Sequence, residues 1–157
     1  MNDSDNTRRE KIVARMQAQS GVDEALIERV VRRFYEHVQQ DALLGPIFAS
    51  RIVEWEPHLA RMQSFWSSVA LMSGQYHGQP MPLHARLAIE SRHFDRWLEL
   101  FEATVLELCE PLAARHFMER AHRIAQSLEI GVAAANGIIL KRDERYVKMP
   151  EVSGPLA

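Results

Sequence analysis

The chain has 157 residues, 46% of them hydrophobic and 25% charged, which is the composition of an ordinary globular domain large enough to bury a core. Its formal net charge of −2 argues against broad electrostatic binding to nucleic acid or to an anionic membrane surface. Because there is one cysteine, no signal-peptide pattern at the start and no apolar run near the roughly 20 residues that span a bilayer, we expect a cytoplasmic protein without a membrane partner.

The chain is expected to form one domain between two tails. Residues 1–21 are polar and predict an N-terminal extension with at most one short helix, around residues 11–17. Residues 22–140 carry the apolar periodicity of a domain, whereas residues 141–157 mix charge with proline and glycine and are expected to be a mobile tail. No segment alternates with period two, so the fold class is predicted to be all-α, with four main helices.

The first helix of the domain should begin after Asp23, because aspartate is a favoured helix cap. Apolar residues then recur at helical spacing and place Phe34 and Tyr35 on the inward side of this helix. The Gly-Pro pair at residues 45–46 is expected to turn the chain while presenting Phe48 to the interior.

The next helix holds a histidine, His58, where an apolar residue would be expected. Pro57 suits the first turn of this helix. The apolar stripe on which His58 lies continues with Met62, Phe65 and Trp66. A buried imidazole needs a partner for each ring nitrogen. One interpretation is a core histidine bonded to a backbone carbonyl; the other is a histidine that faces a cavity holding something other than protein.

Residues 73–82 contain two glycines and two prolines, so they are not expected to form a long helix. His84 follows directly and is expected on a short turn or a brief helix. A purely structural helical bundle would have little need for such an irregular segment. His84, directly after it, is therefore a candidate functional residue.

Two more helices are expected before the C-terminal tail. Ser91 or Asp95 is the predicted cap of the first, whose inward stripe includes Trp97 and which should end before Pro111. The last helix is expected to span residues 113–135, with Asn-Gly at 136–137 as its stop.

Two Glu-x-x-His pairs offer the ligand spacing of a di-iron carboxylate site: Glu90 with His93, and Glu119 with His122. Such a site requires both pairs to project inward, whereas Glu119 falls on the polar face of its helix and Glu90 and His93 straddle a helix start. We therefore expect these residues at the surface. Cys109 has no histidine at a motif-defined distance and is expected to be a packing residue rather than a nucleophile.

Four residues from four different segments form a more promising set: Tyr35, His58, His84 and Trp97. Singly, each is more often a core residue than a site residue. Together they offer one histidine on a constrained turn and several hydrogen-bond donors. A five-coordinate haem iron needs that combination, with a neutral imidazole on one side and donors for a bound diatomic molecule on the other.

Five sequence blocks in a fixed order resemble the group III truncated haemoglobins. They are F-Y-E-H-V at 34–38, G-P-I-F at 45–48, W-x-x-H-x-x-x-x-x-x-F-W at 55–66, Y-x-G-Q-P-x-x-x-H at 76–84 and F-x-x-W-L-x-L-F at 94–101. The resemblance covers roughly residues 22–135, and the paired-glycine motifs of the other truncated-globin groups are absent. It implies a truncated globin fold, a two-over-two helical sandwich around non-covalent haem b.

The resemblance also implies roles for individual residues. His84 corresponds to the proximal iron ligand, Tyr35 and Trp97 to distal hydrogen-bond donors, and His58 to the residue at the distal gate. The walls of the haem pocket would be formed by Phe34, Phe48, Met62, Phe65 and Trp66. Arg61, one turn after Pro57, is a candidate partner for a haem propionate because of its charge.

The function implied is tight binding of oxygen, nitric oxide or another diatomic ligand. Two distal donors favour retention over release, so redox chemistry on oxygen, nitric oxide or peroxide, supported by a cellular reductase, fits better than oxygen transport. Nitric oxide dioxygenase-like and peroxidase-like activities are the enzymatic candidates. The alternatives are an oxygen or redox sensor without turnover, a cofactor-free helical interaction module and the di-iron protein, which a visible absorption spectrum would separate.

Overall fold

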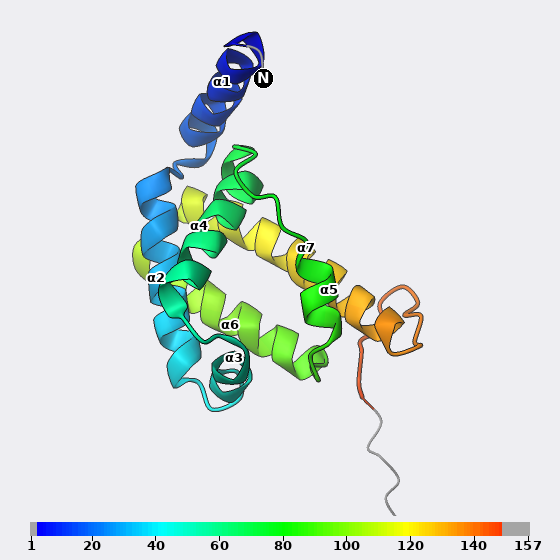
Figure 1. The fold of residues 1–157 in the computed structure, drawn as a ribbon. Coiled ribbons are helices and arrows are strands. Elements are labelled where there is room, and N and C mark those ends of the chain that lie inside the picture. Colours follow the sequence, from blue (N-terminus) through cyan, green and yellow to red (C-terminus); the bar gives the residue numbers. More distant parts are fainter. Residues whose placement is uncertain (1–2, 149–157) are drawn as a thin grey trace, which may run out of the picture.

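The computed structural model describes residues 3–148, and these residues form seven α-helices and no strand (Figure 1). The helices are α1 (Asp3–Ser20), α2 (Glu24–Gln40), α3 (Gly45–Arg51), α4 (Trp55–Leu71), α5 (Pro80–Ala85), α6 (Ser91–Leu108) and α7 (Pro111–Ala135). The predicted all-α fold class is confirmed. In this described part of the chain, no helix is both long and apolar enough to cross a bilayer.

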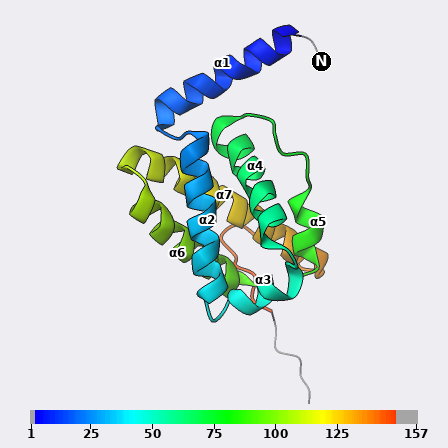
Figure 2. The same cartoon turned by 60° about the vertical axis from the view of Figure 1, so that its left-hand side comes forward.

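Four of the long helices, α2, α4, α6 and α7, make up two layers. Helix α2 packs beside α4, and α6 packs beside α7, while contacts of α2 with α6 and of α4 with α7 join the two pairs. Figures 1 and 2 show the α2–α4 pair lying across the α6–α7 pair, with the short α5 next to α7. This arrangement is the predicted two-over-two sandwich.

A stack of three aromatic rings joins the two layers at the centre of the core. The ring of Phe101 on α6 is fully buried and lies parallel to Trp66 of α4 at 4.8 Å and to Trp97 of its own helix at 5.5 Å. Phe34 and Phe117 meet Phe101 edge-on, at centroid distances of 5.4 Å and 6.1 Å. Each such buried ring removes a large apolar area from water, and the stacking fixes the planes of both tryptophans.

The segment after α2 differs from a simple turn, because residues 45–51 continue as helix α3. Pro46 lies in the first turn of α3, where its missing N–H costs no hydrogen bond. A Cβ on Gly45 would lie 3.0 Å from the carbonyl oxygen of Gln39, so the close approach of α3 to the end of α2 favours glycine there. Phe48 is half-buried against the core, as expected.

The helix ends agree with the sequence in part. Asp23 caps α2, since its side chain accepts a hydrogen bond from the Leu26 N–H at 2.8 Å, and Gly137 ends α7 with a φ of +82°. Helix α6, however, is capped by Glu90 rather than by Ser91 or Asp95. The Glu90 carboxylate and the His93 ring form a reciprocal capping box. The usual preference for aspartate or serine as a helix cap does not predict it.

Both predicted tails carry more structure than expected. Helix α1 has 18 residues instead of one or two turns and leans out from the rest of the fold, with Val13 and Met16 against the core (Figure 2). Good helix formers dominate its sequence, which explains a helix without an apolar stripe. At the other end, residues 141–148 pack on α6 and α7 and include the buried Tyr146, whereas the rest of the predicted tail lies outside the described residues.

Candidate functional site

Tyr35 of α2 and His58 of α4 are in contact where these two helices of one layer pack together. Their rings meet edge-on, with centroids 4.9 Å apart. Tyr35 is 6% exposed, and burial alone raises the pKa of its phenol above the ordinary value of 10. The phenol therefore keeps its proton at any physiological pH and offers an O–H donor.

His58 is half-buried, and its imidazole is not fully hydrogen-bonded. Among the residues that the structure describes, its Nε2 is the one buried side-chain nitrogen or oxygen without a partner. Burial, followed by repulsion from Arg61 and from His84, lowers the pKa of His58 to about 4, so the ring is neutral near pH 7. An unpaired buried nitrogen favours the interpretation of a histidine that faces a ligand cavity over that of a satisfied core histidine.

Trp97 approaches the same region from α6. It is held by the parallel stack with Phe101 and by an edge-on contact with Phe34 at 5.6 Å. Phe34 also touches Tyr35 edge-on at 5.0 Å, so one buried ring spaces the two proposed donors. Phe48 packs against the other side of Tyr35 at 5.8 Å.

His84 is presented by the six-residue helix α5. Its Nδ1 lies 2.7 Å from the carbonyl oxygen of Pro80, one turn earlier. Because a carbonyl can only accept, Nδ1 must carry the proton and donate it, which leaves the lone pair of Nε2 free for a ligand. His84 also lies near enough to His58 to repel a positive charge there, so the two imidazoles, from α5 and α4, share one electrostatic environment.

The remaining predicted wall residues lie along α4. Met62 and Phe65 are half-buried and pack against the main core, while Trp66 is 3% exposed and belongs to the central aromatic stack. Trp66 therefore lies behind Met62 and Phe65 in the core.

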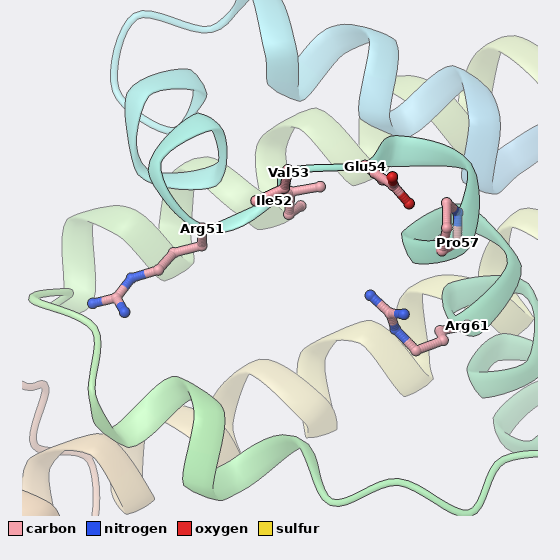
Figure 3. Close-up of a pocket in the computed structure, with 6 residues that line it drawn as sticks. All are labelled: Arg51, Ile52, Val53, Glu54, Pro57 and Arg61. Atoms are coloured by element: carbon pink, nitrogen blue, oxygen red, sulfur yellow. The ribbon is translucent and has the colours of Figure 1, made fainter.

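A cavity of about 350 Å³ opens at the first turn of α4 and is lined by Arg51, Ile52, Val53, Glu54, Pro57 and Arg61. Figure 3 shows Arg61 extending from α4 into the space between the α3–α4 connection and the neighbouring α5, while Arg51 points away from it. Arg61 is exposed and has no carboxylate within salt-bridge distance among the described residues. Its charge is thus available to an anionic group at this rim.

Two site residues were not singled out from the sequence. Trp55 packs on both His58 and Tyr35, each at a centroid distance of 5.8 Å, and its spacing of three residues from His58 is the signal that would have placed it on the same helix face. Pro80 supplies the carbonyl that orients His84, and the spacing of four residues between them is the corresponding signal.

The sequence alternatives are not brought together by the fold. Glu119 and His122 are exposed on α7, as expected, but His93 is buried at 7% exposure, where it caps α6 together with Glu90, so its expected place at the surface was wrong. The two Glu-x-x-His pairs do not converge. Burial raises the pKa of the Cys109 thiol to about 11, which keeps it protonated and unreactive near pH 7.

The donor set fits haem. An iron porphyrin needs one neutral imidazole with a free lone pair, and the tautomer of His84 provides it on α5. The buried, unpaired Nε2 of His58 and the Tyr35 hydroxyl supply polar groups for the opposite side. Arg61 at the open rim supplies a cation for a carboxylate.

Comparisons with known proteins give matches of one kind. The family model for bacterial-like globins matches residues 18–129. The group 3 truncated hemoglobin ctb of Campylobacter jejuni is 32% identical over 113 residues, covering 69% of this chain and 89% of that protein. The crystal structure of a group III truncated hemoglobin from the same species matches with a TM-score of 0.64 at 31% identity, covering 68% of this chain and 88% of that one.

Proposed function

The chain belongs to the bacterial-like globin family, among the group III truncated haemoglobins, and is therefore a haem-binding, oxygen-binding protein; from that premise we propose how its own residues serve these tasks. The proposal is that haem b is held non-covalently between α4 and α5, with His84 as the iron ligand. Tyr35 and Trp97 then hydrogen-bond a diatomic ligand on the other side, and His58 controls access to it.

One observation carries this proposal: the Nδ1–H of His84 already donates to the Pro80 carbonyl, at 2.7 Å, which leaves the Nε2 lone pair free for a metal ion. A hydrogen bond of this kind fixes the ring orientation of a metal-ligating histidine and raises its basicity. Haem, when bound, supplies an iron centre that takes diatomic ligands and exchanges single electrons. Everything else in the site concerns how the chain's residues hold and select those ligands.

Tyr35 and Trp97 act by donating hydrogen bonds to a polarised ligand. Each net bond contributes about 1 kcal/mol, so two of them slow ligand release by roughly 10 to 100-fold. Because the Phe34 and Phe101 rings lock both donors in place, little entropy is lost when the ligand arrives. Slow release suits retention and reaction better than delivery.

His58 and Arg61 serve access and anchoring in this proposal. The His58 ring contacts both Tyr35 and Trp55, so its movement toward solvent would open a path along the first turn of α4. Arg61, one helical turn further on, projects into the cavity at that rim, where a propionate would meet it. The Met62, Phe65, Phe34 and Phe48 side chains provide apolar walls that exclude water from the reacting molecules.

We propose redox chemistry on small oxygen or nitrogen molecules as the physiological task. Nitric oxide and oxygen combine with one electron to give nitrate, so sustained turnover requires a cellular reductase as a partner. Hydrogen peroxide, which takes two electrons and two protons to give two waters, is the second substrate that the polar distal groups can serve. A cytoplasmic location, where reductants are at hand, suits either reaction.

A visible absorption spectrum and a pyridine haemochrome assay of the purified protein test the cofactor proposal. A Soret band with the haem b pattern is expected, and a colourless protein would instead support a helical interaction module. Turnover is tested by nitrate formation from nitric oxide with oxygen and a reducing cell extract. If neither nitrate formation nor peroxide reduction is faster than with free haem, a ligand-binding sensor is the function that remains.

A further inference from the structure

The segment 144–148, which lies beyond residues 18–129 of the family match, is tied down at several points; we refer to it as the C-terminal strap. In Figure 1 the chain after α7 (orange to red) doubles back beside the end of that helix. The guanidinium of Arg145 donates to both carboxylate oxygens of Glu129 on α7, at 2.9–3.0 Å, and to Asp95 on α6 at 2.7 Å. The carboxylate side chain of Glu129 is only 7% exposed, so this charge depends on its partner.

The strap also holds the start of α6 through its backbone. The Ser91 N–H donates to the Tyr146 carbonyl at 2.7 Å, and the Lys148 N–H donates to the Glu90 carboxylate at 2.7 Å. Glu90 is the last residue of the connection that follows His84. Both ends of that connection, residues 86–90, are therefore fixed: one by α5 and the other by the strap.

A second, smaller core lies under the same connection. Its buried members are Ile89, Phe94, Ala125, Val132, Ala133 and Tyr146. The Tyr146 ring is 3% exposed in it, and Leu87 packs at its edge. The strap thus contributes one of the buried side chains that support the backbone between His84 and α6.

Helix α5 rests on the same part of α7. A Cβ built on Gly131 would overlap the sulfur and methyl carbon of Met81, so the missing side chain of Gly131 makes room for α5. Gly131 follows Glu129 by two residues and precedes Val132, which lies in the second core. One stretch of α7 therefore receives α5 and the strap.

We propose that the C-terminal strap, through Arg145, is a positioning element for His84: it clamps residues 86–90 onto α7 and so sets where the imidazole lies. This inference rests on the proposed role of His84 as the iron ligand. Arg145 touches neither ligand nor haem in this proposal and acts through the backbone. When the strap is released, the connection should move more freely, and the bond from His84 to iron should weaken or tilt.

The amide of Leu87 is the most direct reporter, because it donates to the His84 carbonyl at 3.0 Å and makes no bond with the strap. We compare Arg145→Ala with Arg145→Lys and with the control Arg142→Ala, whose exposed side chain has no ion pair among the described residues. Hydrogen exchange is measured on the full chain, with haem and without it. The iron–histidine stretching band of the ferrous haem-loaded protein is recorded by resonance Raman spectroscopy.

In Arg145→Ala, exchange at Leu87 should quicken by about tenfold or more and the iron–histidine band should shift, because a buried carboxylate has lost its partner. Arg145→Lys keeps the charge without the two-pronged geometry and should give a smaller change in both. Arg142→Ala should match the wild type. If Arg145→Ala does not fold, Arg145→Lys against Arg142→Ala makes the same comparison.

Faster exchange at Ser91 and in the strap, with Leu87 exchange and the iron–histidine band at wild-type values, would overturn the proposal. Unchanged exchange in the strap itself would also overturn it, since Arg145 would not then be the clamp. The measurement without haem separates this failure from a failure of the cofactor proposal, which would show as protein that binds no haem or as a normal spectrum in His84→Ala.

Discussion

Replacement of Tyr35 by phenylalanine should reduce ligand retention with little effect on stability. The substitution removes one hydroxyl and keeps the ring that packs on Phe48, Trp55 and His58. Among the described residues this hydroxyl has no hydrogen-bond partner, and desolvation is the one cause that raises the phenol's pKa. A residue that served only the core would be expected to pair that group.

The magnitudes follow from the state of that hydroxyl. The hydroxyl makes no hydrogen bond among the described residues, so the haem-free Tyr35→Phe variant should match the wild type in stability to within about 1 kcal/mol. In the haem-loaded protein the same hydroxyl donates to oxygen. Its loss removes about 1 to 2 kcal/mol of retention, and the dissociation rate of oxygen should rise by roughly 5 to 30-fold.

Urea unfolding of the haem-free protein, followed by circular dichroism, measures the first quantity, and stopped-flow displacement of oxygen measures the second. Tyr146→Phe is the matched control, because Tyr146 is similarly buried at 3% exposure and keeps its backbone hydrogen bond with Ser91. The control should release oxygen at the wild-type rate. A dissociation rate for Tyr35→Phe equal to that of the wild type, or a haem-free variant destabilised by more than about 1 kcal/mol, would refute the assignment of Tyr35 as a distal donor.

Four further results are expected. His84→Ala should lose haem readily and recover a five-coordinate spectrum with added imidazole; a normal ferrous spectrum without imidazole would contradict its role. Trp97→Phe should release oxygen several-fold faster, with an effect that does not simply add to that of Tyr35→Phe because both donors touch one ligand. Burial, Arg61 and His84 lower the pKa of the inward His58 ring to about 4, whereas a ring turned out into solvent has the ordinary pKa of about 6.5. Between these two pH values the proton binds the outward ring and so favours the outward state. Carbon monoxide association should therefore quicken as the pH falls from about 6.5 toward about 4, and His58→Ala should abolish this dependence. Arg61→Ala should speed haem transfer to an acceptor globin, whereas Arg142→Ala, an exposed arginine outside the cavity, should not.

The sequence predicted those parts of the fold that depend on local chemistry. Apolar periodicity located the four helices of the two layers, and Asp23 and Gly137 marked two of their ends. The proline-rich stretch predicted a short turn or a brief helix for His84, and the structure has the helix. Helix α1 was underestimated because it has no continuous apolar stripe, although its residues favour helix. The cap at Glu90 was missed because it depends on a histidine three residues later.

Contacts between residues that are far apart in the chain could not be predicted from the sequence. The pairing of Arg145 with Glu129 joins residues separated by a helix end and a loop, so no periodic pattern signals it. The candidate site residues were named through a family resemblance, but the proton position on His84 and the unpaired nitrogen of His58 depend on atoms from neighbouring turns. These details determine which side of each ring can bind a ligand.

In the parallel stack of Trp66, Phe101 and Trp97, the Phe101 ring lies in the centre of the core and also packs directly against Trp97, the proposed ligand donor. Phe101 is fully buried and would never touch a ligand, yet any change in its size would tilt Trp97. With Trp97 as the proposed donor, we expect a substitution at Phe101 to alter ligand affinity along with folding stability. We expect the two properties to change together as the sequence diverges, so that adaptation to a new growth temperature would require a compensating change elsewhere in the distal site.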